Sequence, residues 1–191
     1  MIETERLIVR PWRESDRDEY LASCNSEAVT AFLGGTAKVE DIDAGIARIA
    51  KSQDEHGFSF WAVERKSDGR FLGYCGLKLA NLPGTPVEKD VEIGWRLRED
   101  AWGQGYAKEA AAASLDLAFG RFEAPQVVAV TALGNVPSQG LMKRLGMVRR
   151  EELDFVDQRF PADSEVNPQV VFTIDAAAWR SARQATLTTS R

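Results

Sequence analysis

Hydrophobic and polar positions follow two different periods along the chain, and each period predicts a kind of element. Apolar residues at every second position are typical of strands, and apolar residues three and four apart are typical of helices. Strands are predicted at 7–10, 60–64, 71–79, 91–97, 126–132, 147–156 and 169–174. Helices are predicted at 15–24, 39–55, 106–119, 136–145 and 176–182. This order favours a mixed α+β (α/β) sandwich around one sheet, with a single domain at 1–182 and a polar, disordered tail at 183–191.

Turn and cap residues mark where several of these elements begin and end. Ser15 is a candidate N-cap for the first helix, and Asp175 is one for the last. Gly57 and Gly146 are expected to end the helices that precede them. The residues 67–69, Ser-Asp-Gly, predict a hairpin turn between two strands, and the segments 81–89 and 157–168 are predicted to be loops.

Composition and charge narrow the class of protein. The chain has 191 residues, 44% hydrophobic and 28% charged, which suits one folded globular domain. Its formal charge is 24 − 29 = −5, so a general nucleic-acid binder is a poor candidate. Two cysteines and one histidine exclude a disulfide scaffold and a two-histidine metal site, and no metal is expected. With no visible signal peptide and no long apolar run, we expect a soluble, cytoplasmic protein without a membrane partner.

The segment with the most informative chemistry is a glycine-rich turn between a predicted strand and a predicted helix. The first amide groups of a helix lack partners within the helix, and the helix dipole adds partial positive charge there, so such a turn can bind a phosphate. Lys108 could add a charge-assisted hydrogen bond. The candidate residues of this phosphate site are Gly103, Gln104, Gly105, Tyr106, Ala107 and Lys108. The alternative is a tight turn that needs glycine for its backbone angles and binds nothing.

The turn lacks the Gly-Lys-Ser/Thr of a P-loop, and its spacing does not end in the third glycine or alanine of the dinucleotide fingerprint. It resembles the acyl-CoA pyrophosphate loop of the GNAT superfamily of N-acetyltransferases, Arg/Gln-x-x-Gly-x-Gly/Ala. The chain aligns as Trp102-Gly103-Gln104-Gly105-Tyr106-Ala107, with Trp102 where Arg or Gln is usual.

The resemblance extends over nearly the whole chain. Segments 4–7 (Thr-Glu-Arg-Leu) and 10–12 (Arg-Pro-Trp) look like the opening of the branch typified by ribosomal-protein N-terminal acetyltransferases. The segment 92–95 (Glu-Ile-Gly-Trp) looks like the fourth strand of that branch. Segments 135–138 (Asn-Val-Pro-Ser) and 145–147 (Leu-Gly-Met) look like its helix start and exit turn. This implies a GNAT-like fold, with a central, mostly antiparallel, twisted sheet of about seven strands flanked by helices.

The resemblance also implies a reaction, in which a primary amine takes the acetyl group of acetyl-CoA by direct attack with the help of a general base. The amine would belong to a protein N-terminus or to a small molecule, and a homodimer is compatible with the family. Backbone groups of Trp95, Arg96 and Leu97 would pair with the pantetheine arm. Gly94 is a candidate for a bulge that opens the sheet there.

Glu92 is the candidate base, because it interrupts an apolar strand and burial would suit it to proton transfer. The alternative is that Glu92 lies on a solvated strand face. Asn135 would bind the CoA arm, or act only as a helix N-cap. Ser138 is the candidate proton donor at the sulfur, with Tyr106 as its rival. Arg144, in a basic cluster with Lys143, Arg149 and Arg150, is a candidate for the 3′-phosphate, or else lies at a solvated helix end.

Other interpretations stay open. The acidic residues of the loop 157–168 would either attract a cationic amine or simply be solvated. A binding module that holds CoA or acyl-CoA without turnover is the main alternative to an enzyme. A nucleotide-phosphate enzyme is disfavoured by the missing P-loop residues, and a direct nucleic-acid partner is disfavoured by the acidic charge.

Overall fold

The computed structural model describes residues 1–189, which form an eight-stranded sheet with the order β1-β2-β3-β4-β5-β6-β8-β7. The strands are β1 (Ile2–Glu3), β2 (Leu7–Arg10), β3 (Phe60–Arg65), β4 (Phe71–Leu79), β5 (Val91–Leu97), β6 (Gln126–Ala132), β7 (Val148–Arg149) and β8 (Gln169–Asp175). The helices are α1 (Asp16–Cys24), α2 (Glu27–Thr30), α3 (Val39–His56), α4 (Tyr106–Gly120), α5 (Val136–Arg144) and α6 (Ala176–Thr189), with short 3-10 turns η1 (Glu99–Ala101) and η2 (Glu151–Leu153).

Strand pairing confirms a mixed fold built on a mostly antiparallel sheet. β1 with β2, β2 with β3, β3 with β4, β6 with β8, and β7 with β8 are antiparallel pairs. β5 and β6 pair in parallel, with Val91 opposite Val127 and Glu92 opposite Val128. The chain divides into two compact units.

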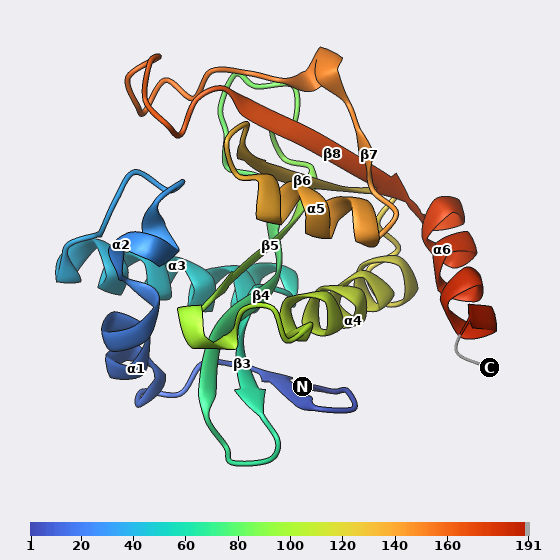
Figure 1. Ribbon diagram of the computed structural model, residues 1–191, viewed down its shortest axis with the longest axis horizontal. Helices are drawn as coiled ribbons and strands as arrows, with labels where there is room; N and C mark the ends of the chain where they lie inside the picture. Colours follow the sequence, from blue (N-terminus) through green and yellow to red (C-terminus); the bar gives the residue numbers. More distant parts are fainter. Residues whose placement is uncertain (190–191) are drawn as a thin grey trace. The chain divides into compact units, whose positions relative to one another are not determined.

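The first unit comprises Met1–Lys78 and Ile93–Ser114. Here β3 and β4 form a hairpin, with α1, α2 and α3 on one side of it (Figure 1). α3 is amphipathic and ends at Gly57, whose positive φ of 76° suits glycine and whose N–H donates to the Gln53 carbonyl. The core of this unit combines residues of α1, α2 and α3 with strand residues, namely Tyr20, Cys24, Val29, Ile42, Ala62 and Phe71.

The second unit comprises Leu79–Glu92 and the chain from Leu115 onward. β6 pairs with β8 along its whole length, from Gln126 opposite Asp175 to Ala132 opposite Gln169. α6 follows β8 directly (Figure 1). The Trp179 indole N–H donates to the Asp116 carboxylate at 2.9 Å and so fastens α6 to α4. The apolar cluster under the loop after β4 consists of Ala80, Leu82, Val87, Val128 and Val171.

Most of the predicted elements are confirmed, but the predicted strand at 147–156 is interrupted in its middle. Val148–Arg149 pairs with β8, the chain then turns into η2, and Phe155 forms an isolated antiparallel bridge with Gln169 of β8. The reason is the Asp154 carboxylate, which accepts two hydrogen bonds from the Arg149 guanidinium, one of them at 2.6 Å. The same carboxylate accepts the Val171 backbone N–H at 3.1 Å. The Asp154 carboxylate therefore accepts a backbone N–H of β8 that a carbonyl of a neighbouring strand would otherwise accept.

Two helix boundaries also differ from the predictions. Ser15 makes no side-chain cap on α1, and instead the Asp16 carboxylate accepts the Arg13 backbone N–H at 2.7 Å. α6 continues to Thr189, beyond the predicted end at residue 182. The pattern gave no indication of the short elements β1, α2, η1 and η2, because a segment of two to four residues is too short to show a period.

Candidate functional site

The glycine turn lies in the first unit, between η1 and the start of α4. Gly103 and Gly105 have φ values of 71° and 82°, in the left-handed region that favours glycine. A Cβ built on Gly103 would meet nothing within 4 Å, so the outer side of the turn is open. Open space, glycine backbone and the N-terminal amides of a fifteen-residue helix together fit a phosphate group.

Trp102 has a structural role at the position where the family has Arg or Gln. Its indole N–H donates to the Leu97 carbonyl at 2.8 Å, which ties the turn to the end of β5. The Trp102 side chain is 48% exposed. Because the phosphate contacts expected of this turn come from backbone amides, Trp102 leaves them in place.

The other predicted residues of the turn differ in exposure. Gln104 and Lys108 are exposed, and the Gln104 side chain donates to the Asp100 carbonyl at 2.7 Å. Tyr106 is buried, with the Arg6 guanidinium 4.6 Å from its ring centroid. This packing favours a structural role for Tyr106 over the role of proton donor.

The second half of β5 also belongs to the first unit. The Arg96 carbonyl faces β4, because a Cβ built on Gly73 would lie 2.1 Å from that oxygen. The Arg98 N–H likewise donates to the Leu72 carbonyl of β4 at 2.9 Å. Backbone groups of successive strand residues point to opposite edges, so those of Trp95 and Leu97 point away from β4.

Gly94 lies close to an aromatic ring of the hairpin. A Cβ built there would lie 2.7 Å from Cζ of Phe60, whose ring stacks on Tyr74 with centroids 5.1 Å apart. The hairpin has a register shift between Val63 and Glu64, and the bulge at Gly94 stays a prediction. Gly94 is therefore required by close aromatic packing.

The Arg96 side chain enters this aromatic cluster. Its guanidinium lies 5.8 Å from the Tyr20 ring centroid and 5.6 Å from that of Tyr74, and it donates to the Tyr20 hydroxyl. Within residues 1–189, its buried Nε has no hydrogen-bond partner. Trp12 packs edge-on against Tyr20 at 5.5 Å. A cation beside several aromatic faces is a stabilising arrangement, and sequence periodicity gave no hint of it.

Glu92 lies in the second unit, in register with Val128 of β6. Its side chain is buried, with 9% exposure, which excludes the solvated strand face. The pKa of Arg159 is raised, first by its hydrogen bonds to Asp157 and more weakly by the negative charge of Glu92. The loop 157–168 therefore brings a cation into electrostatic range of Glu92.

The acidic residue at the start of this loop is occupied. Asp157 is buried and accepts hydrogen bonds from the Arg159 guanidinium, one at 2.6 Å. Asn167 closes the loop, accepting the Asp157 N–H at 2.8 Å and donating to the Pro161 carbonyl at 3.0 Å. The negative charge of Asp157 is therefore already compensated by Arg159, which weakens its attraction for a cationic amine.

Asn135 and Ser138 meet at the start of α5, also in the second unit. The Asn135 side chain accepts the Ser138 N–H at 3.3 Å, which confirms the N-cap, and donates to the Thr131 hydroxyl at 2.9 Å. Much of the predicted basic cluster is paired, because Arg149 contacts Asp154 and Arg150 contacts Glu152. Arg144 is exposed at the end of the helix.

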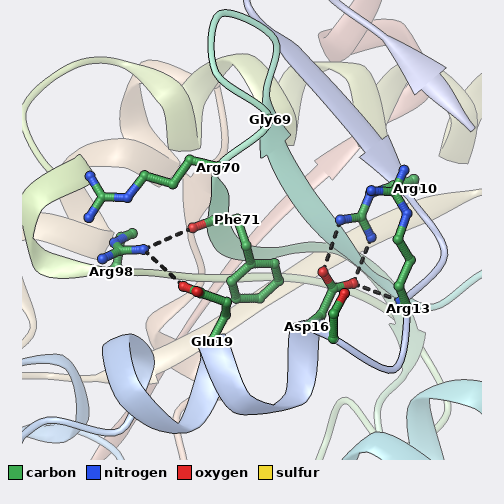
Figure 2. A pocket seen from close by; sticks show the side chains of 9 residues that line it. Arg10, Arg13, Asp16, Glu19, Gly69, Arg70, Phe71 and Arg98 are labelled. Carbon is green, nitrogen blue, oxygen red and sulfur yellow. Dashed lines mark hydrogen bonds and ion pairs between the residues drawn. The ribbon is translucent and has the colours of Figure 1, made fainter.

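A separate open pocket of about 500 Å³ lies in the first unit beside α1. Four arginines line it, but their charges are balanced by carboxylates. Figure 2 shows Asp16 between Arg10 and Arg13, and Glu19 next to Arg98. We interpret this pocket as an ion-pair cluster that holds α1 on the hairpin, outside the candidate site.

The described part of the chain, residues 1–189, also has two negative findings. None of its helices is long and apolar enough to cross a membrane. It contains no group of three or more His, Cys, Asp or Glu side chains that could hold a metal ion.

Comparison with known proteins gives a consistent result. The family described as acetyltransferase (GNAT) domain matches residues 6–148. The chain is 34% identical to the uncharacterised protein YkkB of Bacillus subtilis over 145 residues, covering 75% of this chain and 83% of that protein. It is 29% identical to the FsC-acetyl coenzyme A-N(2)-transacetylase of Aspergillus fumigatus over 140 residues, 71% of this chain and 57% of that enzyme. The crystal structure of an acetyltransferase from Agrobacterium tumefaciens has the same fold, with a TM-score of 0.74, 23% identity, and coverage of 91% of this chain and 92% of that one. The family match spans well over half of the chain and includes the glycine turn, and the chain therefore belongs to the GNAT family of acetyltransferases.

Proposed function

We propose that the protein is an acetyl-CoA-dependent N-acetyltransferase that acetylates a primary amine. The observation that carries the proposal is the glycine turn in front of the N-terminus of α4, which is left-handed at Gly103 and Gly105 and open at Gly103. GNAT enzymes use acetyl-CoA, and one relative is named as an acetyl coenzyme A transacetylase. When bound, acetyl-CoA supplies the activated acetyl group.

The glycine turn and the second half of β5 would hold the cofactor. Backbone amides of residues 103–107 would bind the pyrophosphate, and exposed Lys108 would add charge. On β5, the backbone groups of Trp95 are best placed for the pantetheine arm, because they point away from β4. The Arg96 carbonyl is turned toward β4, and the Leu97 carbonyl already accepts the Trp102 indole N–H.

Glu92 and Ser138 would be the proton-transfer groups. Only a neutral amine attacks, and a lysine amine is about a thousandth neutral at pH 7, so a base is needed. Glu92 would take the proton, directly or through a water molecule. Ser138, fixed by the Asn135 cap, would donate a proton toward the sulfur, and exposed Arg144 would contact the 3′-phosphate.

We further propose that the enzyme belongs to the branch of ribosomal-protein N-terminal acetyltransferases. The support is the set of segments at 4–7, 92–95 and 135–138. The acceptor would then be the α-amino group of a protein N-terminus, with a small-molecule amine as the alternative. An α-amino group has a pKa of about 7.7–8.0 and so needs less help from a base than a lysine amine does.

The first test is thermal unfolding with and without acetyl-CoA, with ATP and NAD as control ligands. A ligand at about 100 times its Kd stabilises by roughly 2.7 kcal/mol, which for a chain of this length is a Tm increase of about 5–10 °C. We expect that increase with acetyl-CoA alone. An unchanged Tm with acetyl-CoA would contradict the assignment of the glycine turn.

The second test is an amine-acceptor screen, followed by Glu92→Gln and Ser138→Ala. Glu99→Gln, an exposed glutamate on η1, is the matched control for Glu92→Gln. We expect Glu92→Gln to lower kcat by about 10²–10⁴-fold at neutral pH while the Tm increase with acetyl-CoA stays. Acetyl-CoA binding without acetylation of any amine by the wild type would indicate a binding module instead.

A further inference from the structure

The N-terminal segment of the chain is fastened to the first turn of α4 by a set of short hydrogen bonds. The Glu109 carboxylate accepts the Thr4 hydroxyl at 2.6 Å, the Arg6 backbone N–H at 2.8 Å and Arg6 Nε at 2.7 Å. All of these residues lie in the first unit. The contact joins positions 103 residues apart in the sequence.

The Arg6 guanidinium also contacts the glycine turn itself. Its Nη1 donates to the Gln104 carbonyl at 2.9 Å, and its Cζ lies 4.6 Å from the centroid of the Tyr106 ring. A Cβ built on Gly105 would stand 3.3 Å from Arg6 Nη2. One side chain thus reaches three consecutive residues of the turn.

This arrangement answers an electrostatic difficulty. Glu109 lies in the first turn of α4, where its charge suits the helix dipole but would repel a phosphate bound at the same helix end. Arg6 balances that charge through a bond with Glu109, whose side chain is 15% exposed. The Gln104 carbonyl, an acceptor that would also repel phosphate, is held by the same guanidinium.

We propose that Arg6 is a positioning residue for the cofactor, which holds the glycine turn in its phosphate-binding conformation and neutralises Glu109. This role rests on the proposed function, because it assigns the phosphates of CoA to the turn. Thr4 assists by holding the same carboxylate. Lysine cannot replace Arg6, because a single ammonium group lacks the fork that bonds Glu109 and Gln104 together.

The test compares Arg6→Ala, Arg6→Lys and the double variant Arg6→Ala/Glu109→Gln. The matched control is Arg17→Ala. Arg17 has a similar exposure and a two-point contact with Asp43, and it does not touch the turn. The Kd for CoA is measured by calorimetry. Amide hydrogen exchange across residues 102–109 is measured in the ligand-free protein.

We expect Arg6→Ala to raise the Kd for CoA roughly tenfold or more, and Arg17→Ala to leave it unchanged. Amide hydrogen exchange across residues 102–109 should be faster in Arg6→Ala and unchanged in Arg17→Ala. The double variant should recover part of the affinity, because the unbalanced carboxylate is gone. Arg6→Lys should stay closer to Arg6→Ala than to the wild type.

Three results would overturn the positioning role. They are an unchanged Kd in Arg6→Ala, full recovery in Arg6→Lys, and unchanged exchange in the turn. A merely structural role would lower the Tm of Arg6→Ala while leaving its Kd for CoA at the wild-type value. If the wild-type protein does not bind CoA at all, the proposed function fails together with this role. Wild-type binding with an unaffected Arg6→Ala refutes the positioning role alone.

Discussion

Replacing Asp16 with alanine should strongly destabilise the protein, because Asp16 balances a buried arginine. The Asp16 and Arg10 side chains are 4% and 5% exposed. Asp16 accepts from Arg10 at 2.6 and 2.9 Å and from the Arg13 backbone N–H at 2.7 Å. Arg10 also donates to Glu64, so the variant leaves one guanidinium with a single carboxylate partner. Breaking a buried ion pair from one side costs about 3–5 kcal/mol.

For a chain of this length, about 2–4 °C of Tm is lost per kcal/mol, so Asp16→Ala should lower the Tm by roughly 6–20 °C. Differential scanning calorimetry measures this change. Asp16→Asn keeps the shape and one acceptor and should lose less. Asp43→Ala, which breaks an exposed pair with Arg17, is the control and should leave the Tm unchanged. A Tm for Asp16→Ala within about 2 °C of the wild type would refute the reasoning.

Two further predictions concern packing and pH. Gly94→Ala should lower the free energy of unfolding, measured by urea denaturation, by about 1–3 kcal/mol, because the new Cβ would lie 2.7 Å from a Phe60 ring that is held against Tyr74. The same substitution should lower it less in a Phe60→Leu background, and equal losses in the two backgrounds would contradict the packing argument. Burial tends to raise the pKa of Glu109, but the hydrogen bonds from Thr4 and Arg6 outweigh it and lower that pKa below its ordinary value. A carboxyl with a lowered folded-state pKa contributes stability above its unfolded pKa of about 4.3, and this is lost as pH falls through the folded value. The free energy of unfolding of the wild type minus that of Glu109→Gln should therefore be constant near neutral pH and shrink below about pH 4; a difference that grows on acidification would contradict the assigned hydrogen bonds.

The elements that the sequence predicted well are those whose cause is local. β6 was predicted as a strand at 126–132, where the residues are almost all apolar, and its Val127 and Val128 have no exposure. The end of α3 at Gly57 and the Asn135 cap of α5 each depend on one residue and its near neighbours. The left-handed angles of Gly103 and Gly105 are likewise the reason that these positions are glycine.

The features that the sequence did not predict depend on partners far away in the chain. The predicted strand at 147–156 is interrupted where Asp154 bonds both Arg149 and the backbone of β8, and an apolar period gives no sign of such a bond. Gly94 was expected to mark a bulge, and the pattern gave no sign of its contact with Phe60, which belongs to another strand. A one-dimensional pattern shows which residues are apolar, but not which side chain will stand opposite them.

The contact between Arg6 and Glu109 changes how the glycine turn is understood. A helix N-terminus with two glycines has donors enough for a phosphate, but a carboxylate in its first turn works against binding. Residues 4–7 and 102–107 were two separate marks of one family resemblance, and the structure joins them through Glu109 and the Gln104 carbonyl. The turn is also tied to β5 by Trp102. Two hydrogen bonds therefore hold the turn, one from Arg6 to the Gln104 carbonyl and one from the Trp102 indole to the Leu97 carbonyl. Since backbone amides are effective only when they are held in place, this bracing supplies the order that a short, exposed turn of glycines lacks by itself.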